Sequence, residues 1–307
     1  MTITDRVLGV LGQFGFLFGE LLLLFIGISF LVAMLQIYIS KDRIQRLLTT
    51  KRKGLNSVLG AALGAVTPFC SCSTVPILVG LFKSGAPFSG AISFLFTSPI
   101  LNPAIIILML SFFGWQATLV YSVFTFLFAV VMGLVLDKLG FQNQVKNVRI
   151  KGGSEDDVAF KDLQGSLGQR HWQAIKLSLK DAWGLLKGVL PYLLIGAGIG
   201  AFIYEFVPED LLGQFAGSNN WIAVPIAALI GIPMYIRTET MIPIASILIG
   251  KGVGLGTMIA LIIGGAGASI PEISLLASIF KKKMMIVFVV AIFSVATITG
   301  WLFNALL

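Results

Sequence analysis

The sequence has few charged residues, two cysteines and a single histidine. Asp, Glu, Lys and Arg together make up 12% of its 307 residues, about half of their share in a soluble domain. This scarcity argues against soluble enzymes and DNA-binding domains. Two cysteines cannot form the disulfide framework of a small secreted protein. The sequence also lacks a Gly-x-x-x-x-Gly-Lys-Ser/Thr phosphate-binding loop, so the chain carries no ATPase of its own.

Apolar residues are abundant instead. They account for 57% of the chain and include 24 phenylalanines, a composition opposite to that of a disordered protein. A transmembrane helix needs about 20 mostly apolar residues. Runs of this kind occur at 16–39, 55–83, 89–111, 115–136, 184–204, 221–250, 254–280 and 284–306. We therefore predict an all-α polytopic membrane protein that is embedded in the lipid bilayer and has no nucleic-acid partner.

Two of these runs, 55–83 and 221–250, are too long for a simple crossing. About 29 helical residues would reach roughly 43 Å, against a hydrocarbon core of about 30 Å. Polar residues and proline interrupt both runs near their middles. We predict that each run forms two short half-helices.

The placement of the basic residues predicts the topology. The net charge of +8 is concentrated in short runs beside apolar stretches, and Lys and Arg favour the cytoplasmic side. We therefore expect segments 41–53, 137–183 and 281–283 inside, and the acidic segment 205–220 outside. The number of apolar runs between these segments requires one run in each half to enter and return without crossing. The two overlong runs are the natural re-entrant hairpins.

This topology makes the two halves of the chain inverted repeats of four segments, each with a broken or re-entrant hairpin that carries a polar motif. Many secondary transporters have this architecture. Motifs of similar order support the repeat, because Thr97–Pro103 aligns with Gly265–Pro271. We divide the chain into a first transmembrane repeat at 1–136, a linker at 137–183 and a second transmembrane repeat at 184–307.

The linker 137–183 is the hydrophilic part of the chain. Its middle is rich in glycine and acidic residues, as in a flexible linker. Its end places Trp172, Leu179 and Trp183 on one helical face, which predicts an amphipathic helix in the cytoplasmic interface. We expect His171, at the start of that helix, to be solvated or at headgroup level rather than to bind a metal.

The first polar motif lies in the middle of the run 55–83, between two prolines. Its candidate substrate-binding residues are Cys70, Ser71, Cys72, Ser73 and Thr74. Irregular backbone at membrane depth is tolerated only inside the protein or along a wet cavity. In an extended break both thiols would lie on one side, and thiolates bind soft metals or trivalent arsenic. The alternative is that these small residues allow close packing of helices.

Ionisable and amide side chains elsewhere in the apolar runs are the other candidates. We select Arg237, Thr238 and Glu239 as substrate-binding residues, because ionisable groups within a membrane segment are costly and by default functional. Two carboxylates accompany one arginine, so Glu272, with Glu239 as second candidate, is predicted to couple transport to protons. The alternative is a structural ion pair of Arg237 with either glutamate. Asn102, between two prolines, is a further substrate-binding candidate, or it closes a helix break.

These motifs resemble those of a known family. The stretches Thr67–Ile77, Phe96–Pro103 and Gly231–Pro243 are similar to those of the predicted permease family that includes YraQ-like proteins and the ArsP organoarsenical exporters. The resemblance covers nearly all of the chain and implies an inner-membrane permease. For the arsenical branch it implies efflux of trivalent methylated or aromatic arsenicals, with the cysteines as candidate ligands.

We interpret the chain as a multi-pass inner-membrane secondary transporter. Its predicted activity is the export of a small thiophilic solute such as a trivalent organoarsenical, with proton coupling as a hypothesis. A permease for another small metabolite or ion is the alternative. A membrane thiol redox enzyme is disfavoured, because such enzymes space their thiols as Cys-x-x-Cys. We predict no catalytic residue, no metal centre and no cofactor, and the oligomeric state stays open.

Overall fold

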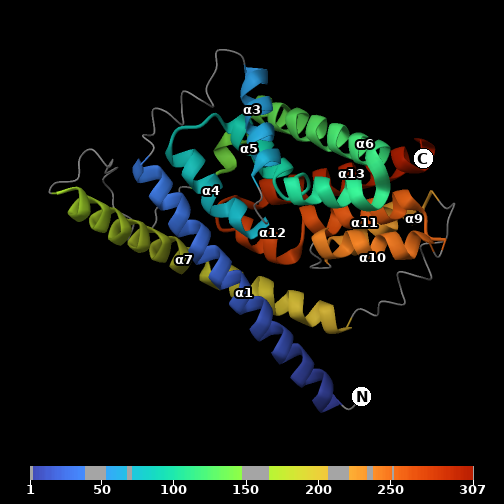
Figure 1. The fold of residues 1–307 in the computed structure, drawn as a ribbon, viewed down its shortest axis with the longest axis horizontal. Coiled ribbons are helices and arrows are strands. Elements are labelled where there is room, and N and C mark those ends of the chain that lie inside the picture. The colour runs from blue at the N-terminus through green and yellow to red at the C-terminus, as the bar shows by residue number, and fades with distance from the viewer. Residues whose placement is uncertain are drawn as a thin grey trace.

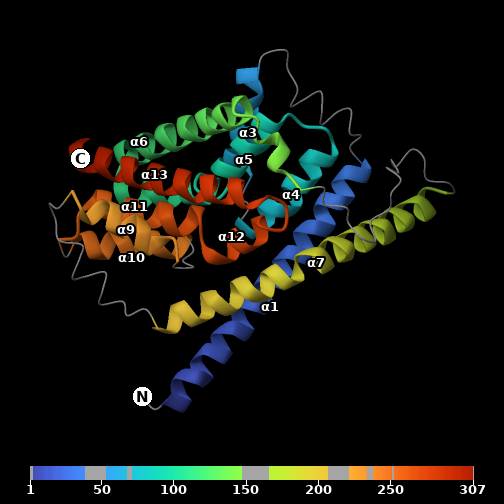
Figure 2. The ribbon, with the colours of Figure 1, turned by 180° about the vertical axis from the view of Figure 1, so that it is seen from behind.

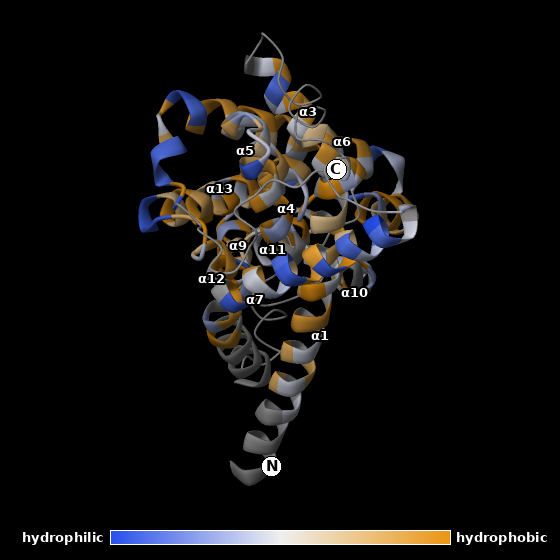
Figure 3. Cartoon of the chain, turned by 90° about the vertical axis from the view of Figure 1, so that its left-hand side faces the viewer, coloured by the Kyte–Doolittle hydropathy of each residue, from blue (hydrophilic) through white to orange (hydrophobic). Residues whose placement is uncertain are grey.

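The computed structural model describes residues 3–38, 53–67, 71–146, 166–206, 221–233, 238–250 and 252–306. Over these residues the chain is helical, apart from turns and isolated β-bridges, in agreement with the predicted all-α class. Among them, Pro103–Lys138, Leu255–Leu276 and Lys282–Leu306 are long and apolar enough to cross a membrane, by length and composition. Hydrophobic residues predominate along the helices (Figure 3).

The first half of the chain begins and ends with long helices. Its elements are α1 (Ile3–Tyr38), α3 (Lys53–Val66), α4 (Ser71–Lys83), α5 (Phe88–Thr97) and α6 (Pro103–Lys138), followed by the 3₁₀-helix η1 (Phe141–Gln144). Within α6, Gly114 adopts φ 79° and ψ 176°, a conformation that glycine reaches without steric cost. The ribbon turns sharply there, so α6 consists of a short and a long leg (Figure 1).

The second half follows the same order of long and short helices. Its elements are α7 (Leu167–Phe206), α9 (Ala223–Gly231), α10 (Thr238–Gly250), α11 (Leu255–Gly267), α12 (Ile270–Leu276) and α13 (Lys282–Leu306). Within the described residues, and with the legs of α6 taken separately, each half has a long helix, four shorter helical segments and another long helix.

More of the apolar runs are broken than their length requires. The runs 89–111 and 254–280, treated above as single segments, each contain a break, at 98–102 and at 268–269 respectively. Prolines stand at both breaks, and proline lacks the backbone N–H that a continuing helix needs. Each break therefore follows from local backbone chemistry.

The helices α1 and α7 cross each other along one side of the molecule (Figures 1 and 2). Where α1 ends, the Tyr38 hydroxyl and His171 Nδ1 form a hydrogen bond, and the two rings stack with centroids 5.7 Å apart. His171 is exposed, as expected, but Tyr38 holds it in place. This contact joins the end of the first helix to the start of the second half's first helix.

The linker boundary proposed at residue 183 does not coincide with a helix end. The amphipathic stretch and the run 184–204 belong to the same helix, α7, and both Trp172 and Trp183 are exposed on it. Residues 172–190 contain no proline, so no backbone hydrogen bond is removed where the composition changes. The change from amphipathic to apolar composition at residue 183 therefore occurs within one helix.

Both ends of the overlong run 55–83 lie at one end of the molecule. Asn56, near the start of α3, and Phe82, near the end of α4, line the same cavity as Asp137 of α6. The helix pair α3–α4 therefore enters and leaves the molecule from the same end. The break between the two helices lies at the far end of this hairpin.

The segment after α6 pairs with the segment between α12 and α13 at this same end. Val145 forms an isolated antiparallel β-bridge with Phe280. The Lys146 N–H donates to the Ile279 carbonyl at 2.7 Å, and the Lys281 N–H donates to the Gln144 carbonyl at 2.9 Å. We call this pairing of residues 143–146 with 277–281 the clasp. It brings together two segments that the charge pattern assigns to the same side of the membrane.

The start of the second overlong run, 221–250, lies at the opposite end of α13. The Trp301 indole N–H donates to the Trp221 carbonyl at 2.9 Å, and the Gly256 N–H donates to Asn304 Oδ1 at 2.9 Å. Because Gly256 lies in the first turn of α11, the chain between α10 and α11 is also at this end. The clasp and this second end are separated by the length of α13.

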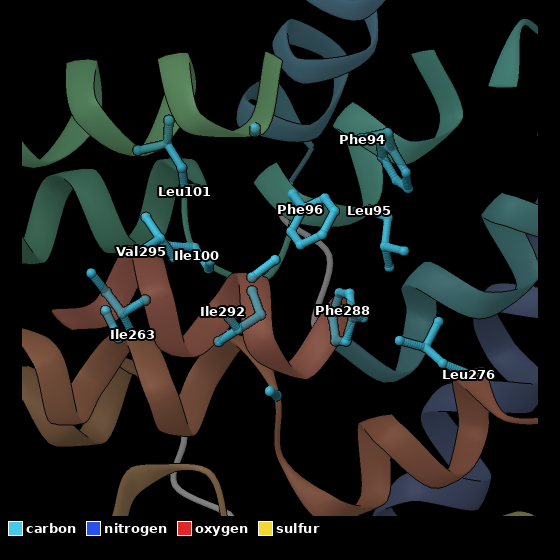
Figure 4. Close-up of a cluster of buried hydrophobic side chains, with 14 of the residues drawn as sticks. Phe94, Leu95, Phe96, Ile100, Leu101, Ile263, Leu276, Phe288, Ile292 and Val295 are labelled. Atoms are coloured by element: carbon cyan, nitrogen blue, oxygen red, sulfur yellow. The ribbon is translucent and has the colours of Figure 1, made fainter. Parts of the chain in front are cut away.

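The halves share one hydrophobic core, in which every residue of α5 is buried. Side chains of α5, α11, α12 and α13 meet there (Figure 4), and the rings of Phe96 and Phe288 lie 5.2 Å apart. Glycines bring the backbones close, since a Cβ on Gly60 of α3 would lie 2.0 Å from the Gly90 oxygen of α5. Small residues at helix contacts are the usual means of tight packing within membranes.

Candidate functional site

The breaks of the two halves meet inside the molecule. A Cβ on Gly267, at the end of α11, would lie 3.2 Å from Ile100 Cδ1 in the break that precedes α6. Ile100 and its neighbour Leu101 are buried, and Figure 4 shows them beside the side chains of α13. The structure thus brings together the two aligned motifs, Thr97–Pro103 and Gly265–Pro271. Such paired breaks are the kind of place where transporters bind their solutes.

Asn102 has a defined structural part in this break. It is buried, and its Oδ1 accepts a hydrogen bond from the Ile105 N–H at 2.9 Å. This is the N-cap arrangement, which satisfies one of the free backbone donors at the start of a helix. Of the two interpretations offered for Asn102, closing the helix break is therefore the one with an observed hydrogen bond.

Ser98 also lies in this break, although it was not among the candidates selected from the sequence. It is fully buried, and within the described part of the chain its hydroxyl has no hydrogen-bond partner. A buried hydroxyl without a partner costs free energy. The available signal was its position before Pro99 in an apolar run. We add Ser98 to the candidate site.

Glu272 lies in the first turn of α12, directly after the second break. Its side chain is fully buried, and α12 packs against α7 and α4. Ser269, which precedes α12, is also buried but makes no side-chain capping bond. In the sequence, Glu272 and Ser269 thus lie within five residues of Gly267, where the two breaks meet.

The run 55–83 is interrupted, as predicted, but the break is shorter than the polar motif. Ser71 to Thr74 already belong to α4 and Pro76 lies inside that helix, so the expected extended stretch does not include Cys72. The helix α3 ends at Val66, α4 begins at Ser71, and the Thr67 hydroxyl donates to the Leu63 carbonyl at 2.7 Å. Thr74 is buried in α4. Of the other candidates, Cys70 and the side chains of Ser71, Cys72 and Ser73 lie outside the described residues.

The second polar motif likewise separates two helices. The helix α9 ends at Gly231, where a Cβ would lie 2.5 Å from the Leu261 oxygen of α11, and α10 begins at Thr238. Thr238 is buried. Arg237 and the side chain of Glu239 lie outside the described residues, so the proposed ion pair stays a prediction. Among the described side chains, no group of three or more His, Cys, Asp and Glu residues could hold a metal.

Comparison with known proteins now places the chain among its relatives. A family model described as a predicted permease, ArsP_1, matches residues 14–305. The chain belongs to this permease family. It is therefore a membrane permease, and the family resemblance inferred from the polar motifs is confirmed.

Three relatives of this permease extend over most of its length. UPF0718 protein MJ0584 of Methanocaldococcus jannaschii is 23% identical and aligns with 83% of each chain. UPF0718 protein YcgR of Bacillus subtilis is 24% identical over 85% of this chain and 86% of its own. UPF0718 protein YraQ of Escherichia coli is 24% identical over 82% of this chain and 68% of its own. None of these three names states a substrate, and no solved structure matches the chain.

Proposed function

We propose that this permease is a multi-pass inner-membrane secondary transporter that exports a small thiophilic solute, with trivalent organoarsenicals as the first candidates. The observation that carries the proposal is the meeting of two broken helices at Ile100 and Gly267, in a chain of the permease family. Helix breaks expose backbone groups that can bind a solute. The buried hydroxyl of Ser98 adds a polar group at this place.

An inverted relation between the halves is part of the proposal. The hairpin α3–α4 opens beside the clasp, at the start of α13, whereas the segment after α10 leads to Gly256 at the opposite end of α13. The 25 residues of α13 correspond to a helix of about 37 Å, which exceeds a hydrocarbon core of about 30 Å. This supports two hairpins that enter the membrane from opposite sides.

Cysteine labelling tests this topology. We expect single cysteines introduced at Asn219 and Leu307 to react with a membrane-impermeant maleimide from the periplasm. Cysteines at Lys51 and Asp156 should react only after the membrane is opened, because basic segments favour the cytoplasm. Periplasmic labelling at Asp156 would contradict the topology and both re-entrant hairpins.

Replacement of the two cysteines tests the substrate class. Cys70 lies between α3 and α4 in the sequence, and Cys72 lies in the first turn of α4. Thiolates bind trivalent arsenic far better than hydroxyl groups do. The chain should be expressed in a bacterial strain without arsenical efflux, and uptake of methylarsenite into everted vesicles measured. We expect the Cys70→Ser/Cys72→Ser variant to insert normally and to lose about tenfold or more of this uptake.

A matched control is the change of two serines outside the motif, Ser111→Ala and Ser122→Ala on α6, which leaves both thiols in place. Equal transport of methylarsenite by the cysteine variant and the wild type would show that the cysteines are packing residues. If the wild type itself fails to transport methylarsenite, the same vesicles should be used with antimonite, soft metal ions and small sulfur compounds. Failure with all of these would overturn the thiophilic substrate.

A further inference from the structure

A cavity of about 470 Å³ lies beside the clasp, at the end of the molecule where α3 and α5 begin. Its size falls within the range of small-molecule sites. Its polar and aromatic lining comprises Asn56, Phe82, Phe88, Ser89, Asp137 and Gln142. Phe82 follows Cys72 by ten residues in the sequence of α4, or about 15 Å along a helix. The cavity is therefore separate from the cysteine motif at residues 70–72.

The charge of the cavity wall favours a cation. Asp137 is the one ionisable residue among those that line the cavity. The Gln142 side-chain amide donates to Asp137 Oδ1 at 2.6 Å, which orients the carboxylate. Asn56 and Ser89 are both buried, so the wall also contains two neutral oxygen-bearing side chains.

Two aromatic rings complete the cavity. Phe82 and Phe88 both line it, and their rings stack at 6.2 Å between centroids with 17° between their planes. An aromatic face attracts an ammonium group, and this attraction together with a carboxylate is how proteins recognise organic cations. A bare divalent metal would need six or more oxygen ligands in a tight shell. One carboxylate and three neutral oxygen-bearing side chains in a cavity of this volume do not provide that shell.

In the second half, an asparagine takes the position that corresponds to Asp137. Asn304 follows Gly300 by four residues in α13, as Asp137 follows Gly133 in α6. Its Oδ1 accepts the Gly256 N–H at 2.9 Å, so the amide is used within the protein. The corresponding position of the second half therefore carries no carboxylate.

We propose that this cavity binds an organic cation, an ammonium compound held by the Asp137 carboxylate and the rings of Phe82 and Phe88. The occupant also lies against Gln142 and Val145, next to the clasp with the second half. Binding there joins the end of α6 to the segment that pairs with Phe280. The proposal does not depend on which solute the permease exports.

Calorimetric titration of the full-length chain in lipid nanodiscs tests the proposal. The probes are choline, benzyltrimethylammonium, and the uncharged choline isostere in which a tert-butyl group replaces trimethylammonium. We expect saturable binding of at least one cation, at least about tenfold tighter than binding of the isostere. Asp137→Asn should weaken cation binding by about tenfold or more, whereas Asp181→Asn on α7 should leave it unchanged.

Phe82→Leu provides a second variant, because it keeps apolar volume and removes the aromatic face. We expect it to weaken cation binding while the isostere is unaffected, and the melting temperature of each variant checks its folding. Equal affinities for cation and isostere, unchanged binding by a folded Asp137→Asn variant, or absence of saturable binding of both cations to the wild type would each overturn the proposal.

Discussion

Replacing Gly60 by alanine should prevent the permease from assembling. The added Cβ would lie 2.0 Å from the Gly90 oxygen and 2.6 Å from the Gly90 carbonyl carbon. Both atoms belong to the backbone of α5, a helix buried at every residue, so neither can move aside. Overpacking of this kind costs about 3 kcal/mol or more. The measurement is the yield of monodisperse protein in mild detergent, followed by thermal unfolding.

Gly54→Ala in the same helix is the matched control. No atom lies within 4 Å of the position that its Cβ would take, and alanine is favoured over glycine in a helix by about 1 kcal/mol. We expect this variant to be as stable as the wild type or slightly more stable. Normal yield and melting of Gly60→Ala would mean that the backbones of α3 and α5 leave room for a methyl group at this contact.

Glu272→Gln should abolish the dependence of transport on a pH gradient. The side chain is fully buried in α12, next to the second break. Glutamine keeps its size and hydrogen-bonding capacity but cannot release or take up a proton. Exchange of solute across the membrane should persist, because exchange needs no net proton movement. Uptake into everted vesicles with and without an imposed pH gradient separates these two activities.

Asp181→Asn on α7 removes a carboxylate that is only partly buried, and we expect it to leave pH-driven uptake unchanged. If a correctly inserted Glu272→Gln variant keeps the full dependence of uptake on the pH gradient, Glu272 has a structural role. Another group must then couple transport to protons. Glu239→Gln is then the next variant, because Glu239 is the second carboxylate among the proton-coupling candidates.

The sequence by itself determined the features that depend on local chemistry. The length and composition of the apolar runs predicted a helical membrane protein, because burial in lipid requires about 20 apolar residues in succession. Proline predicted the breaks near Thr67 and before α10, because a missing N–H acts on the helix in which it occurs. The Cys-Ser-Cys-Ser-Thr segment between two prolines led to the permease family, since this short pattern is uncommon.

Only the tertiary structure decided which of these features come together. The contact between Ile100 and Gly267, the burial of Ser98, and the cavity at Asp137 join residues that are distant in the chain. The structure also shows that α7 continues through the predicted boundary at 183. A change from polar to apolar composition does not by itself end a helix. Such contacts depend on the packing of several helices at once, and no local pattern of residues specifies that packing.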